Sequence, residues 1–292
     1  MSRPVPPGSV RRVSIAAGLA AVLVGSFSAP ALAEPMIPSA YPMVWSDEFD
    51  RDGAPDPAKW VADIERNRLG WWNNERQYYS ANRLDNARVE HGNLVIEARR
   101  DGPSLAGLPD WGRQAYSSAR LITRGHGQWT YGAYEIRAKL PCARGSWPGI
   151  WMLPADPKVV WPSGGEIDIM EHVGADLGKI HFSTHTKAQN FIDHTENTAQ
   201  ATVGDDCTAF HRYQLRWTPK QIVMGVDDRR MFSLKKAADR RDLWPFDRPF
   251  FLILNIAVGG DWGGIKGIDD AGFPTRMEVD YVHVFGAGAA HR

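Results

Sequence analysis

Short segments in which hydrophobic and polar residues alternate recur along the chain, and such alternation predicts half-buried β-strands. Residues 134–140 place a hydrophobic side chain at every second position and a charged one between, and residues 213–217 repeat the alternation. Residues 250–258 are almost continuously apolar, which predicts a strand in the centre of a sheet. Further strands are predicted at residues 93–99, 117–123, 180–186, 222–226 and 277–285.

Helical periodicity is scarce, and residues 234–244 are the best candidate for a turn or two of helix. Many short strands separated by Gly, Pro, Asn and Asp predict an all-β fold, in which two antiparallel sheets form a sandwich. The chain has no long linker and no internal repeat. We therefore expect one domain over residues 41–286, with a short lead at 34–40 and a tail at 287–292.

The strand predicted at residues 166–171 carries three acids in six positions. Glu166 and Asp168 alternate with isoleucines, so strict alternation would place Glu171 on the hydrophobic face. An unpaired carboxylate buried there would cost several kcal/mol. A β-bulge at Ile169 and Met170 adds one residue and returns Glu171 to the acidic face. We therefore predict a bulged strand with three carboxylates on one face.

Three acids on one strand face repel one another, so such a strand has a cost that structure alone does not explain. Glycoside hydrolysis needs two carboxyl groups that flank one bond, and this arrangement suits it. The alternative is a solvated acidic edge strand. Glycine and tryptophan residues around the acids favour the catalytic interpretation.

Composition and charge argue against several classes of function. The 292 residues include 34 Lys and Arg and 34 Asp and Glu, so the formal net charge is zero. No basic run interleaves with aromatic residues, as nucleic-acid binding would require. The nine histidines include no pair at metal-ligand spacing, which argues against a catalytic zinc ion. The 12 tryptophans suit a protein that stacks sugar rings on aromatic faces.

The N-terminus has the three regions of a secretory signal peptide. Arg11 and Arg12 precede an apolar run at 13–25, and the sequence Ala-Leu-Ala at 31–33 supplies a cleavage site. We expect a signal peptide at residues 1–33 and a secreted or periplasmic protein. The two arginines also fit a twin-arginine signal in part, and no other segment is apolar enough to cross a membrane.

The chain has two cysteines, Cys142 and Cys207. An even number of cysteines in an exported protein permits one disulfide, and we predict that these two residues form it. The alternative is a pair of separate buried thiols.

The chain resembles glycoside hydrolase family 16 in seven segments that follow one another in the family's order. The segment GEIDIMEH at 165–172 is similar to the family's catalytic signature in its bulged form. The resemblance covers residues 41–285 and implies a β-jelly-roll whose concave face forms a glycan-binding cleft. The other segments are WSDEFD at 45–50, WNNERQYY at 72–79, WPGIWMLP at 147–154, FHRYQLRWT at 210–218, the stretch at 250–262 and MEVDYV at 277–282.

The resemblance implies catalytic roles for the three acids. Glu166 matches the nucleophile, which forms a covalent glycosyl-enzyme, and Glu171 matches the general acid and then base. Retention of configuration requires these carboxyl groups to lie about 5–5.5 Å apart. Asp168 is expected to hydrogen-bond Glu166. A neighbouring negative charge should raise the pKa of Glu171, while Glu166 stays ionised.

The resemblance and the setting of the residues also point to substrate binding. Trp147 and Trp151 match cleft tryptophans, although core packing is the alternative for each. Asn74 and Arg120 match residues that hydrogen-bond sugar hydroxyls in the family's β-1,3-glucanases, and a surface salt bridge is the alternative for Arg120. Further candidates are two tryptophans in loops and two histidines, which have a purely structural role as their alternative: Trp161, Trp262, His185 and His172.

Members of this family often bind a structural calcium ion on the convex face. The matching positions are Glu48, the carbonyl of Gly92 and Asp280, and oxygen ligands of this kind suit calcium. An ordinary surface salt bridge is the alternative. We expect catalysis to need no cofactor.

Together, these features predict a secreted, retaining endo-β-1,3-glucanase that acts on laminarin-like polymers. The segment at 72–79 resembles the β-1,3-glucanase version of the family. The alternatives are the same chemistry on mixed-linkage glucan, agarose or carrageenan, transfer of the glycosyl group to a sugar, or glucan binding without hydrolysis. We expect a monomer that binds polysaccharide, with no nucleic-acid partner and no membrane partner after signal cleavage.

Overall fold

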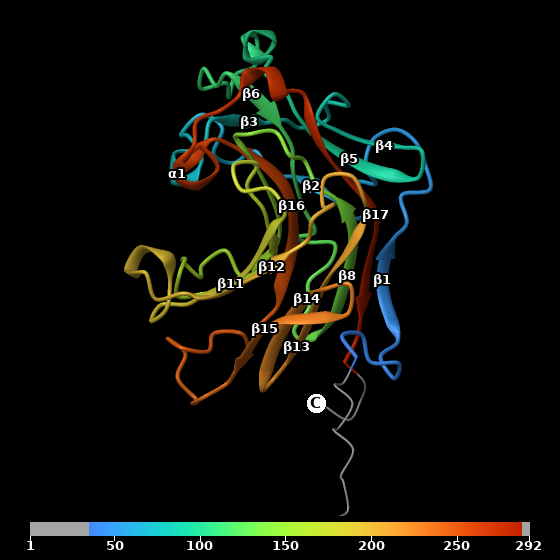
Figure 1. Ribbon diagram of the computed structural model, residues 1–292, viewed down its shortest axis with the longest axis vertical. Helices are drawn as coiled ribbons and strands as arrows, with labels where there is room; N and C mark the ends of the chain where they lie inside the picture. Colours follow the sequence, from blue (N-terminus) through green and yellow to red (C-terminus); the bar gives the residue numbers. More distant parts are fainter. Residues whose placement is uncertain (1–34, 288–292) are drawn as a thin grey trace, which may run out of the picture. The chain divides into compact units, whose positions relative to one another are not determined.

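The computed structural model describes residues 35–287, which form two large antiparallel sheets (Figure 1). The predicted signal peptide at 1–33 lies outside the described residues, as does the predicted tail except for its first residue. Within the described range, no helix is long and apolar enough to cross a membrane.

The first sheet has eight strands in the order β15-β14-β13-β8-β17-β5-β4, with β1 paired to β17. The bounds of these strands are β1 Met43–Asp47, β4 Ala87–Glu90, β5 Asn93–Ala98, β8 Gly132–Lys139, β13 His211–Thr218, β14 Gln221–Val226, β15 Arg229–Lys235 and β17 Thr275–Phe285.

The second sheet has seven strands in the order β12-β11-β10-β9-β16-β7-β2. The bounds of these strands are β2 Val61–Ala62, β7 Arg120–Ile122, β9 Ser146–Pro154, β10 Glu166–Glu171, β11 Lys179–His185, β12 Asn197–Thr202 and β16 Phe250–Val258. Two short strands, β3 Gln77–Tyr79 and β6 Tyr116–Ser118, pair in parallel. The remaining elements are η1 Trp72–Asn74, η2 Gly102–Leu105, η3 Phe191–Asp193, α1 Gly260–Gly263 and η4 Asp270–Gly272.

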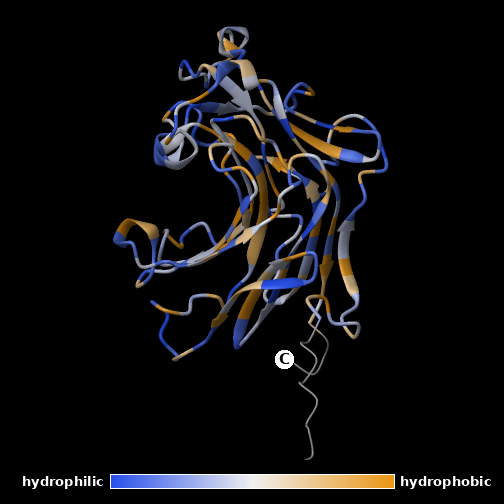
Figure 2. Cartoon of the chain, in the orientation of Figure 1, coloured by the Kyte–Doolittle hydropathy of each residue, from blue (hydrophilic) through white to orange (hydrophobic). Residues whose placement is uncertain are grey.

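One large hydrophobic core contains alternate residues of both sheets, as expected for a sandwich. Tyr134 and Trp217 enter it from the eight-stranded sheet, and Ile167 and Leu254 enter it from the seven-stranded sheet. All four are fully buried. Figure 2 shows the hydrophobic residues along β16, which runs through the middle of its sheet.

Most of the predicted strands are confirmed, and the residues predicted as a central strand are β16. The predicted strand at 117–123 is divided into β6 and β7, which join different sheets, with Ala119 between them. The helix predicted at 234–244 is wrong. Leu234 instead belongs to β15 and pairs with Ile222 of β14. The residues after β15 are mainly exposed and charged, so a helix there would have no apolar face to bury.

The predicted disulfide is confirmed: Cys142 and Cys207 are bridged, with their Cα atoms 5.8 Å apart. The bridge ties the segment that follows β8 to the loop before β13. The predicted lead also packs against the sandwich within the described residues. Met36 is buried, and the carbonyl of Pro35 accepts a hydrogen bond from Arg216.

Candidate active site

Strand β10 is bulged, as predicted. Between Asp168 and Glu171, β10 uses one more residue than either of its partners, β9 and β11. The two residues of the bulge, Ile169 and Met170, are both fully buried in the core. Burying two successive residues resets the alternation, and Glu171 therefore shares a face with Glu166 and Asp168.

The three carboxylates lie on the face of the seven-stranded sheet that points away from the core. Glu166 and Glu171 are half-buried, and Asp168 is 1% exposed. The indole of Trp147 donates a hydrogen bond of 3.0 Å to Oε1 of Glu171. Nε2 of His185 lies 3.2 Å from Oδ2 of Asp168. Glu171 and Asp168 thus each have a defined side-chain partner.

Burial is the main cause of a raised pKa for all three carboxyl groups. It raises the pKa of Glu166 to about 8 and the pKa of Glu171 to about 7, and the charges of neighbouring acids add to both effects. It also raises the pKa of Asp168 well above its usual value. The raised pKa of Glu171 and the hydrogen bond between Asp168 and Glu166 agree with expectation.

The prediction that Glu166 stays ionised is wrong for the unliganded protein. Its surroundings desolvate it, and the nearby Asp168 both repels its charge and bonds its protonated form. His185 and the indole of Trp161 oppose this effect, but they do not cancel it. The cluster therefore retains protons near neutral pH.

An aromatic wall stands beside Glu171. The rings of Trp147 and Trp262 are 5.3 Å apart, and the rings of Trp262 and His181 are 4.8 Å apart. Trp262 belongs to α1, which contacts η1. The exposed Asn74 of η1 donates a hydrogen bond of 2.8 Å to the carboxylate of Asp261 in α1.

Arg120 lies on the same face of the sheet and is 8% exposed. Its Nε donates a hydrogen bond of 2.8 Å to Asp63, and its guanidinium lies 4.7 Å from the ring centroid of Trp151. The salt bridge of the alternative is present, but it is buried and not on the surface. Trp151 in turn donates a hydrogen bond of 2.7 Å to Oδ1 of Asn255.

A second aromatic group stands at the Glu166 end of β10. The ring of Trp161 lies 5.2 Å from that of Phe191 and 6.2 Å from that of His185. His172, in contrast, is fully buried next to Asp206, with 3.2 Å between Nε2 and Oδ2. It therefore packs inside the fold and does not line this face.

Sequence reasoning missed two polar residues of the site. Asn255 is the one polar residue in the apolar run of β16, and that exception was the available signal. Glu75 lies in the loop after η1, and it interacts electrostatically with Glu171. Nothing in the sequence separates Glu75 from the exposed polar residues around it, so its position depends on the fold.

The carboxylates of the predicted calcium ligands already have side-chain partners. Asp280 lies on β17 between Val282 and Val279, which pair with Asp47 and Leu94, and Glu48 and Gly92 lie just beyond these partners. Glu48 contacts Nε2 of His283 at 2.9 and 3.1 Å, and Asp280 pairs with Arg137. The oxygen atoms suit calcium, and a bound ion would have to replace these two partners.

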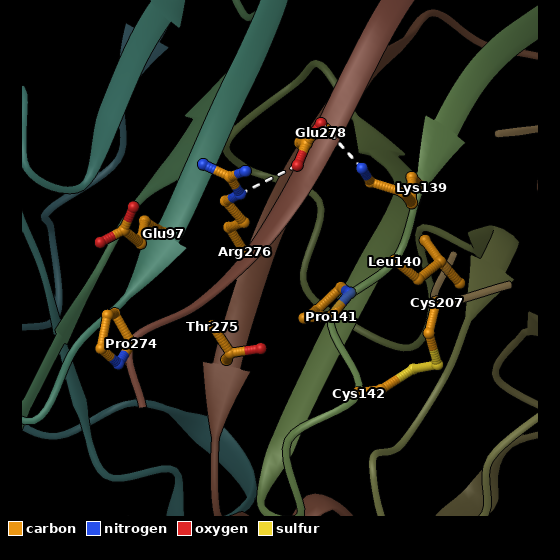
Figure 3. A pocket seen from close by; sticks show the side chains of 10 residues that line it. All are labelled: Glu97, Lys139, Leu140, Pro141, Cys142, Cys207, Pro274, Thr275, Arg276 and Glu278. Atoms are coloured by element: carbon orange, nitrogen blue, oxygen red, sulfur yellow. Dashed lines mark ion pairs between the residues drawn. A yellow bond between two sulfur atoms is a disulfide. The ribbon is translucent and has the colours of Figure 1, made fainter. Parts of the chain in front are cut away.

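One group of possible metal ligands belongs to the carboxylate site itself. Ligand atoms of Glu166, Asp168 and His185 lie within 4.8 Å of one another, but hydrolysis by the two carboxylates requires no metal. A pocket of about 440 Å³, drawn in Figure 3, lies on the eight-stranded sheet beside the disulfide. Both of its acids form ion pairs, Glu278 with Lys139 and Arg276 and Glu97 with Arg88 and Arg99, so it lacks a group of adjacent acids like that on β10.

The sandwich with adjacent carboxylates on a bulged strand is the arrangement of a glycoside hydrolase. The chain belongs to glycosyl hydrolases family 16, whose model matches residues 74–283. A β-glucanase from Rhodothermus marinus is 48% identical over 252 residues, which cover 83% of this chain and 84% of the relative.

Two solved structures support the same family. SCLam, described as a non-specific endo-β-1,3(4)-glucanase from family GH16, is 50% identical, with a TM-score of 0.83 over 87% of this chain and 94% of that chain. The laminarinase from Rhodothermus marinus is 46% identical, with a TM-score of 0.78 over 84% of this chain and 97% of that chain. The predicted family and jelly-roll fold are confirmed.

Proposed function

We propose that this chain is a retaining endo-β-1,3-glucanase in which Glu166 and Glu171 perform the chemistry. The observation that carries the proposal is the bulge of β10, which gathers Glu166, Asp168 and Glu171 on one face. Their pKa values are raised, and one can therefore hold a proton while another is ionised.

In the first step, a carboxylate oxygen of Glu166 attacks the anomeric carbon of the bound glucan. The bond from that carbon to the leaving oxygen breaks, and Glu171 gives its proton to the leaving oxygen. The raised pKa of Glu171, about 7, keeps this proton available in mildly acidic solution. The hydrogen bond from Trp147 fixes the direction of the Glu171 carboxyl group.

In the second step, the ionised Glu171 takes a proton from water. The water oxygen attacks the anomeric carbon, and the bond to Glu166 breaks. Two inversions leave the product with the β-configuration. A sugar hydroxyl in place of water would give glycosyl transfer by the same route.

Asp168 accepts the proton of the nucleophile Glu166. It bonds the protonated form of Glu166, and its own carboxyl lies beside His185. When a sugar enters, the proton has an acceptor in Asp168, and Glu166 is then free to act as an anion. This assignment accounts for the third acid, which two-carboxylate chemistry alone does not need.

The substrate assignment rests on the residues around the carboxylates and on the relatives. Trp147, Trp262 and Trp161 offer aromatic faces, while Arg120 and Asn74 offer donors for hydroxyl groups. One relative is called a laminarinase and another a non-specific endo-β-1,3(4)-glucanase. We therefore place β-1,3-glucan first and mixed-linkage glucan second.

Hydrolysis of agarose or carrageenan, and glucan binding without hydrolysis, have less support. Carrageenan is sulfated, and a sulfated polymer favours a more basic surface than this neutral chain offers. Agarose has less support because the relatives described above are glucanases. A glucan-binding protein without activity would not need Glu166 and Glu171 gathered beside Asp168.

We further propose export of the protein, because residues 1–33 have the regions of a signal peptide, and we expect the exported protein to be a monomer. Sequencing of the N-terminus of the mature protein tests cleavage after Ala33. A mature chain that still begins at Met1 would contradict it, and light scattering tests the monomer.

We also propose that calcium binds at Glu48, the Gly92 carbonyl and Asp280, in place of His283 and Arg137. Binding to the folded state should raise the melting temperature in CaCl₂ relative to EDTA. The Asp280→Asn variant should abolish that difference. Equal melting temperatures in both solutions would assign the carboxylates to salt bridges alone.

A panel of purified polysaccharides tests the main proposal. Laminarin should give the fastest release of reducing ends, mixed-linkage glucan a slower one and cellulose none. The viscosity of a soluble β-1,3-glucan should fall before much reducing sugar appears, because an endo-enzyme cuts inside the chain. Hydrolysis of agarose or carrageenan without hydrolysis of laminarin would contradict the substrate assignment.

A further inference from the structure

The loop after η1 brings a fourth carboxylate, that of Glu75, to the face that carries Glu171. The backbone of Glu75 forms a bridge to Gly259, immediately after β16. The adjacent strand is β9, whose Trp147 hydrogen-bonds Glu171 of β10. The order β16-β9-β10 therefore places Glu75 on the side of Glu171 from which Trp147 approaches.

A buried glutamine fixes the direction of the Glu75 carboxylate. Oε1 of Gln77 accepts a hydrogen bond of 2.7 Å from the backbone N–H of Val258. This bond orients the amide, and Nε2 then donates a hydrogen bond of 2.7 Å to Oε2 of Glu75. Gln77 is fully buried. A Cβ added at Gly260 would approach the backbone oxygen of Asn73 to 2.8 Å and Cγ of Glu75 to 3.3 Å, so glycine lets the loop that carries Glu75 lie close to the start of α1.

The charged groups around Glu75 do not neutralise it fully. The nearby cation is Arg120 of β7, which also bonds Asp63. The phenol of Tyr79 on β3 and the carboxylate of Glu171 on β10 are the other titratable neighbours. Burial outweighs the cation and the two hydrogen-bonding amides, and it raises the pKa of Glu75 to about 7.

We propose that Glu75 is a positioning residue whose negative charge, on the same face as Glu171, extends to higher pH the range in which Glu171 can donate a proton. The inference rests on the proposed role of Glu171 as the general acid. Burial is the largest cause of the raised pKa of Glu171, and the charge of Glu166 is the next. Ionised Glu75 adds a smaller effect of the same sign, because a negative neighbour disfavours a second negative charge, whereas His185 acts in the opposite direction.

The Glu75→Gln variant tests the proposal, because it removes the charge and retains the shape and a hydrogen-bonding oxygen. The high-pH limb of the kcat/KM profile on laminarin should move down by about 0.5–1 pH unit. The activity loss should therefore be larger at pH 8 than at pH 5. Glu75→Asp retains the charge and should retain more of the high-pH limb. Glu65→Gln is the control, since Glu65 is exposed and 3.7 Å from its partner Arg124.

An NMR titration of ¹³C-labelled glutamate in the unliganded protein tests the effect of Glu75 on the pKa of Glu171 without an enzyme assay. The Glu171 signal, assigned with Glu171→Gln, should titrate at lower pH in Glu75→Gln than in the wild type. An unchanged titration, or an equal shift in Glu65→Gln, would overturn the role of Glu75. A shifted titration in a protein that hydrolyses no glucan would instead support the coupling and contradict the proposed function.

Discussion

On the outer face of the eight-stranded sheet, acids lie beside bases, whereas on the site face of strand β10, acids lie beside acids. Glu278 forms ion pairs of 3.1 Å with Lys139 and 2.9 Å with Arg276 (Figure 3). Arg88 lowers the pKa of Glu90 on the same sheet. On β10, burial and like charge raise the pKa of Glu166.

The difference separates two uses of the same residue type. An acid with a cationic neighbour is ionised at little cost, and it contributes to solubility and modestly to stability. An acid next to another acid in a desolvated setting costs free energy, and selection retains such a group where chemistry requires a poised proton. The β10 face is therefore the part of the described residues where function is to be sought.

The largest contrast should appear in activity. Glu166→Gln and Glu171→Gln should each reduce hydrolysis of laminarin by at least about 10²–10⁴-fold, because each removes a group that forms or breaks a bond. Glu278→Gln, the matched change on the other sheet, should retain near wild-type activity. Initial rates of the purified variants, with circular dichroism as the check on folding, measure the contrast. Near-native turnover in either β10 variant would place the chemistry elsewhere.

The next prediction tests whether the bulge of β10 positions Glu171. Deletion of Met170 would restore plain alternation and displace Glu171, and a misplaced acid should cost on the order of 10²-fold in kcat. Met170→Ala retains the residue count, so it should leave Glu171 in place and lower stability by about 2–5 kcal/mol through the cavity. Initial rates and urea denaturation separate the two effects. Unchanged activity in the deletion variant would mean that the bulge does not aim Glu171.

A smaller contrast between the two sheets should appear in the way the free energy of unfolding depends on pH. The folded-state pKa of Glu166, about 8, lies above the ordinary glutamate pKa of 4.5, so ionisation destabilises the fold as pH rises between these values. Glu166→Gln should therefore raise the free energy of unfolding by about 1–3 kcal/mol at pH 9 and leave it unchanged at pH 4.

The change in the free energy of unfolding should have the opposite sign in the Glu90→Gln variant. The pKa of Glu90 is lowered, so its stabilising contribution is present above its unfolded pKa and is lost in acid. The variant should lose less than about 1 kcal/mol at neutral pH and nothing in acid. Urea denaturation at pH 9 and pH 4 measures the effect of Glu166→Gln, and urea denaturation at neutral and acidic pH measures the effect of Glu90→Gln. Destabilisation at pH 9 by Glu166→Gln would show that Glu166 is paired like Glu90.

The sequence was sufficient for the features that depend on local alternation. The strand at 250–258, the bulge at Ile169 and Met170, and the common face of the three acids all follow from the spacing of apolar residues. The helix expected at 234–244 failed because residues 234 and 235 pair with β14, and the exposed, charged residues after them offer no apolar face for a helix to bury.

The features that depend on distant parts of the chain could not be read from the sequence. Arg120 reaches its partner Asp63 across 57 positions, and Glu75 reaches the carboxylates through contacts with the end of β16. The expected ionisation of Glu166 failed for the same reason, since its pKa depends mainly on how deeply the fold buries it. The spacing of residues along a strand shows on which face of the sheet a side chain lies, but the degree of its burial follows from the packing of neighbouring loops and strands.

The anomeric configuration of the first product tests the central claim most directly. Proton NMR of laminarin in deuterated buffer should detect the β-anomer of the new reducing end first, followed by the α-anomer as mutarotation proceeds. This order follows from two displacements, by Glu166 and then by water activated by Glu171. The α-anomer as the first product would contradict the account, because it would mean a single displacement without a glycosyl-enzyme.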